Sequence, residues 1–173
     1  ILAELGKPVP KTLTDLEKIF TAVRTKYPNM IVYPLDKDLT GIDTAMHPYS
    51  AYPFRWFKKG DKLVYGSIQP EVKKGLATLR KWYQNGWIDR EFVVKDWIKA
   101  FIEPTAAGNV FCLRGPWWHI YWPFPDMWNN NPKAEMVAFP PLKGLGGRTM
   151  LVLPPIDYGW GTAINAKFER PEA

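Results

Sequence analysis

Residues 70–85 constrain the fold most, because they carry every local signal of an amphipathic α-helix. Pro70 suits the first helical position, Glu71 lies in the first turn, and Gly86 follows the last turn as a C-cap. A basic face lies opposite an apolar stripe made of Val72, Leu76, Leu79 and Tyr83. We therefore predict a surface helix over 70–85 that packs on the core through this stripe.

Helix signals and strand signals alternate along the rest of the chain. Thr12 and Asp15 have the capping-box spacing at the start of a helix. Asp96 caps a second helix, which Pro104 should kink or end early, and a third helix begins after Gly115 and continues to about residue 130. Expected strands cover residues 30–33, 63–65, 109–113, 134–139, 149–153 and 158–164. The alternation predicts an α/β fold, with a central mixed sheet flanked by helices.

Charge and cysteine content exclude several classes of function. The net charge of +6 raises nucleic acid as a partner, but the basic residues form scattered pairs, so we expect no nucleic-acid binding. Cys112 is the sole cysteine, and His47 and His119 are far apart, so we expect no disulfide, no metal site and no cofactor. No apolar run approaches the roughly 20 residues that cross a bilayer.

Both ends of the sequence carry helix signals. Residues 1–6 are typical of a last helical turn closed by glycine, and residues 171–173 have the Pro-Glu-Ala pattern that starts a helix. We interpret the 173 residues as a piece of a longer polypeptide. The alternative is a chain with frayed ends.

Residues 115–128 hold a dense group of aromatic side chains directly after an expected strand. In an α/β fold, ligands bind at the carboxyl ends of strands, and an indole face can lie flat on a pyranose ring. Trp117, Trp118 and Trp122 are therefore the candidate platform of a sugar site. The polar partners expected for the hydroxyl groups are Arg114, His119 and Asp126. The alternative is that these indole rings belong to the core.

A second aromatic group lies in the loop before residue 57. It consists of Tyr52, Phe54, Arg55 and Trp56. These residues could form the opposing wall of the same site, with Arg55 and Trp56 in contact with the ligand. The alternative is that Arg55 packs on a ring at the surface through a cation–π contact.

Catalytic motifs are missing from the sequence. It has no GxSxG elbow, no P-loop and no HExxH. The carboxylates that could serve glycoside hydrolysis are not distinguished by their spacing, and they comprise Asp96, Glu103, Asp126 and Asp157. We expect a binding protein and no enzyme. The alternative is a glycoside hydrolase or a carbohydrate-binding module.

Several segments, taken in order, resemble a known family. They cover residues 5–12, 61–73, 79–92, 107–111, 115–118, 163–167 and 171–173. Together they are similar to the extracellular solute-binding proteins of ABC sugar importers, particularly the large lipoprotein type of Gram-positive bacteria. Pro104 and Arg114 depart from the family, which usually has a continuous helix at the first position and an apolar or small residue at the second.

The resemblance implies a type 2 periplasmic-binding fold, in which two α/β lobes close on a sugar. Residues 1–173 would form one inserted lobe, with about 1–6 and 157–173 adjoining the hinge and the missing second lobe. Trp160, near the second crossing, is a further candidate ligand contact. The implied partners are an oligosaccharide and the membrane permease of the importer. The implied location is the cell surface, as a lipoprotein, or the periplasm.

Overall fold

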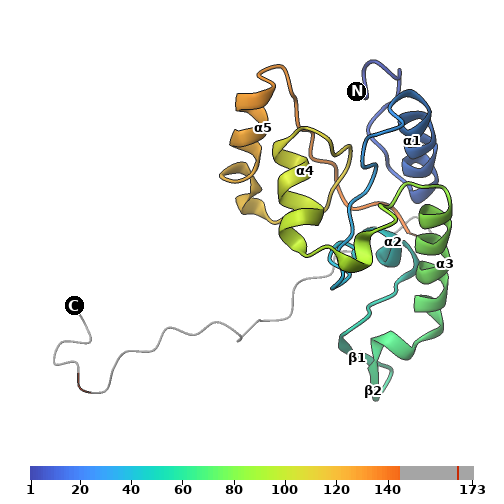
Figure 1. Cartoon of the computed structure of the whole chain (residues 1–173). Coiled ribbons are helices and arrows are strands. Elements are labelled where there is room, and N and C mark those ends of the chain that lie inside the picture. The colour runs from blue at the N-terminus through green and yellow to red at the C-terminus, as the bar shows by residue number, and fades with distance from the viewer. Residues whose placement is uncertain (145–166, 168–173) are drawn as a thin grey trace.

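The computed structural model describes residues 1–144 and residue 167. The named helices and strands are α1 (Leu13–Lys26), α2 (Asp43–Met46), β1 (Trp56–Lys59), β2 (Lys62–Tyr65), α3 (Pro70–Gln84), α4 (Glu103–Ala106) and α5 (Phe124–Asn130). In Figure 1, α1 and α3 lie on one side of the molecule, α4 and α5 pack together on the other, and the β1–β2 hairpin projects from the end near α3. No helix among the described residues is long and apolar enough to span a membrane.

Helix α1 begins with the predicted capping box. The Asp15 N–H donates to Thr12 Oγ1 at 3.1 Å, and the Thr12 N–H donates to Asp15 Oδ2 at 3.0 Å. Two backbone donors that the helix leaves unpaired are thereby satisfied. The buried face of α1 comprises Leu16, Ile19, Phe20 and Val23.

Helix α3 has the predicted position, but its buried face is rotated from the predicted one. The stripe was wrong at Leu76 and Tyr83, which are 52% and 37% exposed. Gly75 and Trp82 are buried instead, beside Val72, Thr78 and Leu79. At Gly75 the backbone meets Met46 of α2 so closely that an added Cβ would lie 2.1 Å from the Met46 sulfur. The close approach of α2 and the burial of the large Trp82 ring decide which face turns inward.

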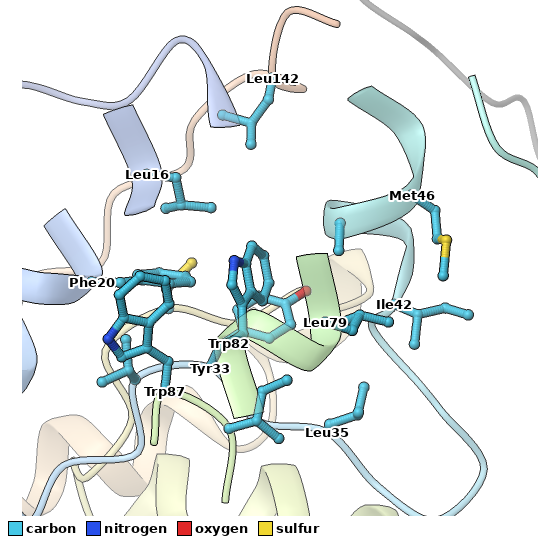
Figure 2. Close-up of a cluster of buried hydrophobic side chains, with 14 of the residues drawn as sticks. Leu16, Phe20, Tyr33, Leu35, Ile42, Met46, Leu79, Trp82, Trp87 and Leu142 are labelled. Atoms are coloured by element: carbon cyan, nitrogen blue, oxygen red, sulfur yellow. The ribbon is translucent and has the colours of Figure 1, made fainter. Parts of the chain in front are cut away.

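Aromatic rings form the centre of the core, which Figure 2 shows in close-up. The rings of Phe20 and Tyr33 meet the Trp82 ring edge to face, with centroids 5.1 and 5.2 Å away. The Trp82 indole N–H donates to Glu17 Oε1 at 3.0 Å, so this fully buried ring leaves no unpaired donor. The core thus joins α1, α3 and the extended chain at residue 33.

Extended segments cross the centre of the molecule in parallel. The Ile31 N–H donates to the Asn109 carbonyl at 3.0 Å, the Phe111 N–H to the Ile31 carbonyl at 2.9 Å, and the Cys112 N–H to the Val32 carbonyl at 3.1 Å. Beside this parallel pairing, the predicted strand at residues 63–65 is present as β2, and it pairs in an antiparallel hairpin with β1, a strand that the sequence analysis placed in a loop; Trp56 lies opposite Tyr65. The carboxyl ends of the two parallel segments therefore emerge on the same edge.

The mixed sheet is smaller in the described residues than the sequence predicts. Its central part is reduced to an isolated parallel bridge between Ile31 and Val110. The one sheet named among the described residues is the two-stranded β1–β2 hairpin. Residues 134–139 form no strand, and no other segment among the described residues pairs with the backbone of 135–139; Met136 and Val137 are 39% and 57% exposed. The strands predicted over 149–153 and 158–164 lie outside the described residues.

Pro104 does not end its helix, so of the two predicted effects, a kink or an early end, the early end is wrong. Asp96 caps the start as expected, because its Oδ1 accepts the Lys99 N–H at 2.9 Å. The chain then forms a π-helical segment, Ile98–Ile102, in which the Glu103 N–H bonds back to the Ile98 carbonyl, and it continues into α4. The wider turn shifts the hydrogen-bond register just before the proline, so the helix passes it without a break.

Candidate functional site

The chain leaves its central parallel segment at Leu113 and turns directly into short helical pieces. A 3₁₀ turn covers Trp117–Ile120, and α5 follows it over Phe124–Asn130. The predicted single helix to residue 130 is therefore divided into two pieces around Pro123, which is not helical. The order of strand, turn and helix is the predicted one, and it brings the tryptophan-rich segment to the edge where both parallel segments end.

Three indole rings form what we call the aromatic cluster, Trp97, Trp118 and Trp122. Trp97 meets Trp118 and Trp122 edge-on, with centroids 5.4 and 5.9 Å away. The rings of Trp118 and Trp122 are 11° from parallel, and their centroids are 6.4 Å apart. Trp97 lies at the start of the π-helical segment, so two separate elements hold these rings in place.

The aromatic cluster reaches the surface of the molecule. Trp122 is 40% exposed, Trp118 is half-buried, and the neighbouring Trp117 is 76% exposed. Trp117 packs against Tyr121 at a centroid distance of 6.2 Å. Trp117 and Trp122 therefore do not belong to the core of the described residues, so the alternative of four core indoles is wrong.

His119 lies beneath the aromatic cluster. It is 2% exposed and contacts the rings of Trp118 and Phe124 at centroid distances of 4.9 and 5.7 Å. An added Cβ on Gly115 would lie 2.2 Å from His119 Nδ1, so only glycine fits there. Neither ring nitrogen of His119 has a hydrogen-bond partner among the described residues, and burial lowers the pKa of His119. The imidazole is therefore neutral at pH 7.

Arg114 contributes to a second feature, which we call the polar pocket. Its Nη2 lies 3.2 Å from Asp43 Oδ2, and the other carboxylate oxygen of Asp43 lies 3.4 Å from His47 Nε2. The hydrogen bond from His47, followed by the charge of Arg114, lowers the pKa of Asp43, so this carboxylate is ionised at neutral pH. The cavity measures about 340 Å³. Its polar side is formed by Asp43, Thr44, His47 and Arg114.

The rest of the wall of the polar pocket is mostly apolar. It comprises Leu113, Val137, Ala138, Phe139, Pro141 and Leu142. The end of this wall is fixed, because Leu142 is buried in the core and the Lys143 N–H donates to the Lys11 carbonyl at 2.8 Å. Gly115 also lines the pocket, and His119 packs against Gly115 from behind. The polar pocket and the aromatic cluster are therefore adjacent, with His119 between them.

The structure does not bring the hairpin tryptophan to the aromatic cluster. Trp56 is 65% exposed and packs on Tyr65 across the hairpin, with centroids 5.2 Å apart. Figure 1 places the hairpin and α5 at opposite ends of the molecule. Arg55 is nearer the polar pocket, because its charge contributes to lowering the pKa of Asp43. Trp160 lies outside the described residues.

Two polar residues and one indole escaped the sequence analysis as site residues. Asp43 and His47 have the (i, i+4) spacing that places side chains together on a helix, which was the available signal. Trp97 follows the capping residue Asp96, but nothing local indicates that it meets Trp118.

The predicted polar partner Asp126 lies exposed in the first turn of α5. Among the described residues, no group of three or more His, Cys, Asp or Glu could hold a metal ion.

This architecture, a mixed α/β arrangement of helices with a small antiparallel sheet, matches part of a solute-binding protein fold. The calcium-free crystal structure of alginate-binding protein AlgQ2 is similar, with a TM-score of 0.68 and 15% identity, over 85% of this chain and 32% of that one. A chitin oligosaccharide binding protein is similar with a TM-score of 0.55 and 10% identity, over 84% of this chain and 36% of that one. No protein-family model and no curated protein matches the chain.

Proposed function

We propose that the protein binds an oligosaccharide, with the aromatic cluster as the platform for a sugar ring. The observation that carries the proposal is the parallel pair Trp118 and Trp122, which reaches the surface beside the polar pocket. Indole faces cover the C–H face of a pyranose and exclude water, while neighbouring polar groups bond its hydroxyls. Both kinds of group are present here, and the buried His119 lies between them.

We further propose that this binding serves uptake by an ABC importer. The chain would be one lobe of a two-lobed protein, and a second lobe would close over the sugar by hinge motion. The parent protein would then be a surface lipoprotein, or periplasmic, and would deliver the sugar to a membrane permease. The similar solved proteins support this proposal, because both are named as binding proteins for saccharides and this chain spans about a third of their length.

Binding without catalysis accords with these similarities. The two similar solved proteins are named as binding proteins and not as enzymes. We therefore expect the intact protein to bind glycans without releasing reducing sugar from them.

Calorimetric titration of the full-length protein with a glycan panel tests the proposal. Trp118→Ala and Trp122→Ala should each weaken binding at least about tenfold, equivalent to about 1.4 kcal/mol, because each removes a stacking face. Tyr83→Ala is the matched control, since this ring is 37% exposed on α3, and it should leave affinity unchanged. The assignment would be overturned if the wild type bound no glycan. It would also be overturned if Trp118→Ala and Trp122→Ala bound the glycan as tightly as the control Tyr83→Ala.

A further inference from the structure

The polar pocket combines the two kinds of surface that a sugar unit presents. Its lining includes Asp43, Thr44, His47 and Arg114, and most of the other lining residues are apolar. A pyranose likewise has hydroxyl groups around its edge and C–H groups on its faces. The cavity volume of about 340 Å³ lies at the small end of the range for ligand pockets, roughly 300–1,000 Å³, which suits a small part of an oligosaccharide.

The Asp43–Arg114 pair keeps hydrogen-bonding capacity for a ligand. Asp43 uses one contact to Arg114 and one to His47, and each carboxylate oxygen has more than one lone pair. Arg114 approaches Asp43 through Nη2, and its side chain is 53% exposed, which leaves further N–H donors toward solvent. A hydroxyl group both donates and accepts. Two neighbouring hydroxyls can therefore donate to Asp43 and accept from Arg114 together.

The polar side of the pocket is held rigidly before any ligand arrives. Asp43 begins α2, whose Ala45 and Met46 are buried in the core. The neighbouring Thr44 hydroxyl hydrogen-bonds the buried Tyr33 hydroxyl at 2.7 Å. Because these contacts fix α2, binding would require little ordering of the carboxylate.

We infer that the polar pocket is a subsite for an uncharged sugar unit, whose neighbouring hydroxyls are bound by Asp43 and Arg114. The inference rests on the proposed function and names the class of sugar. Arg114 is already paired with Asp43, so the guanidinium offers hydrogen-bond donors without an uncompensated charge. A uronate carboxylate at this position would meet the Asp43 carboxylate and be repelled. Arg55 does not line the pocket and cannot offset that repulsion by contact.

The test is calorimetry of the full-length protein with neutral tetrasaccharides of glucose, mannose, galactose and N-acetylglucosamine, and with the uronate counterparts of the first three. The wild type should bind at least one neutral tetrasaccharide more tightly than its uronate. Asp43→Asn should weaken the neutral ligand at least about tenfold and narrow or reverse its advantage over the uronate, because the repulsion is removed. Arg114→Gln, at a half-exposed side chain, should also weaken the neutral ligand.

Urea unfolding shows whether Asp43→Asn and Arg114→Gln fold. If one of these two variants does not fold, the other is used for the test. If the wild type binds the uronate more tightly than the neutral tetrasaccharide, the inference that the subsite takes an uncharged sugar unit is overturned. If Trp118→Ala weakens binding while Asp43→Asn and Arg114→Gln do not, the proposed function stands and this subsite is wrong. If no tetrasaccharide binds, both the proposed function and the subsite fail.

Discussion

Trp118 and Trp122 lie 11° from parallel, with their ring centroids 6.4 Å apart. They are one helical turn apart along the chain, but the ring of Trp97, from a different element, contacts both edge-on. Their common orientation is therefore fixed by tertiary packing and not by the local turn alone. A ligand that stacks on these rings meets a surface already arranged for it, which lowers the entropic cost of binding.

The first prediction concerns Gly115, which separates the polar pocket from His119. Gly115→Ala should destabilise the fold by about 1–3 kcal/mol, because the new methyl group would lie on His119 Nδ1. It should also weaken glycan binding, since His119 supports Trp118. Urea unfolding and calorimetry measure the two effects. The Gly115→Ala/His119→Ala double variant should recover part of the loss, and strictly additive effects would contradict the close contact.

The second prediction concerns the buried indole N–H of Trp82. Glu17→Ala should lower the free energy of unfolding by about 1–3 kcal/mol, because the donor then has no partner inside the core. Glu17→Gln keeps an acceptor oxygen and should cost less. Urea denaturation measures both variants. Glu91→Ala, at an exposed position, is the control and should stay within about 0.5 kcal/mol of the wild type.

The third prediction is a pH dependence of stability that arises from His119. Burial lowers the pKa of His119 in the folded chain, whereas the unfolded chain titrates near 6.5. Below about pH 6.5 the unfolded state therefore binds more protons, so stability falls as the pH falls through that value and is fully present above it. His119→Leu should reduce the difference between urea midpoints at about pH 5 and about pH 7.5. An unchanged difference would show that His119 is not protonated on unfolding.

The fourth prediction concerns the buried thiol. Burial raises the pKa of Cys112 to about 12, so only about one molecule in ten thousand carries a thiolate at about pH 8. Ellman's reagent should react negligibly with the native chain and rapidly after unfolding in urea. Fast reaction of the native chain would mean that the parallel segment holding Cys112 opens readily.

The sequence predicted the positions of the helices better than it predicted which helix faces are buried. The capping box at Thr12 and the proline and glycine around α3 are local signals, and both helices were placed correctly. The exposed Leu76 could not be anticipated, because the close contact between Gly75 and Met46 joins residues far apart in the chain. Likewise, the π-helical segment that carries the chain past Pro104 has no local signature.

The candidate site was predicted in part. The aromatic density around Trp118 indicated a surface platform, because so many neighbouring indoles cannot all face inward. The contribution of Trp97 and the pairing of Arg114 with Asp43 depend on tertiary contacts across long sequence separations. Arg114, a departure from the family pattern in the sequence, is the residue that connects the polar pocket to the edge of the parallel segments.

The most direct measurement of glycan binding at the aromatic cluster is ¹⁹F NMR of the full-length protein labelled with 5-fluorotryptophan. This chain contains nine tryptophans, whose signals are assigned by single Trp→Phe variants. On titration with a bound oligosaccharide, the signals of Trp117, Trp118 and Trp122 should shift, while those of the buried Trp82 and Trp87 stay in place. Unchanged signals from Trp118 and Trp122 at saturating glycan would contradict binding at this surface.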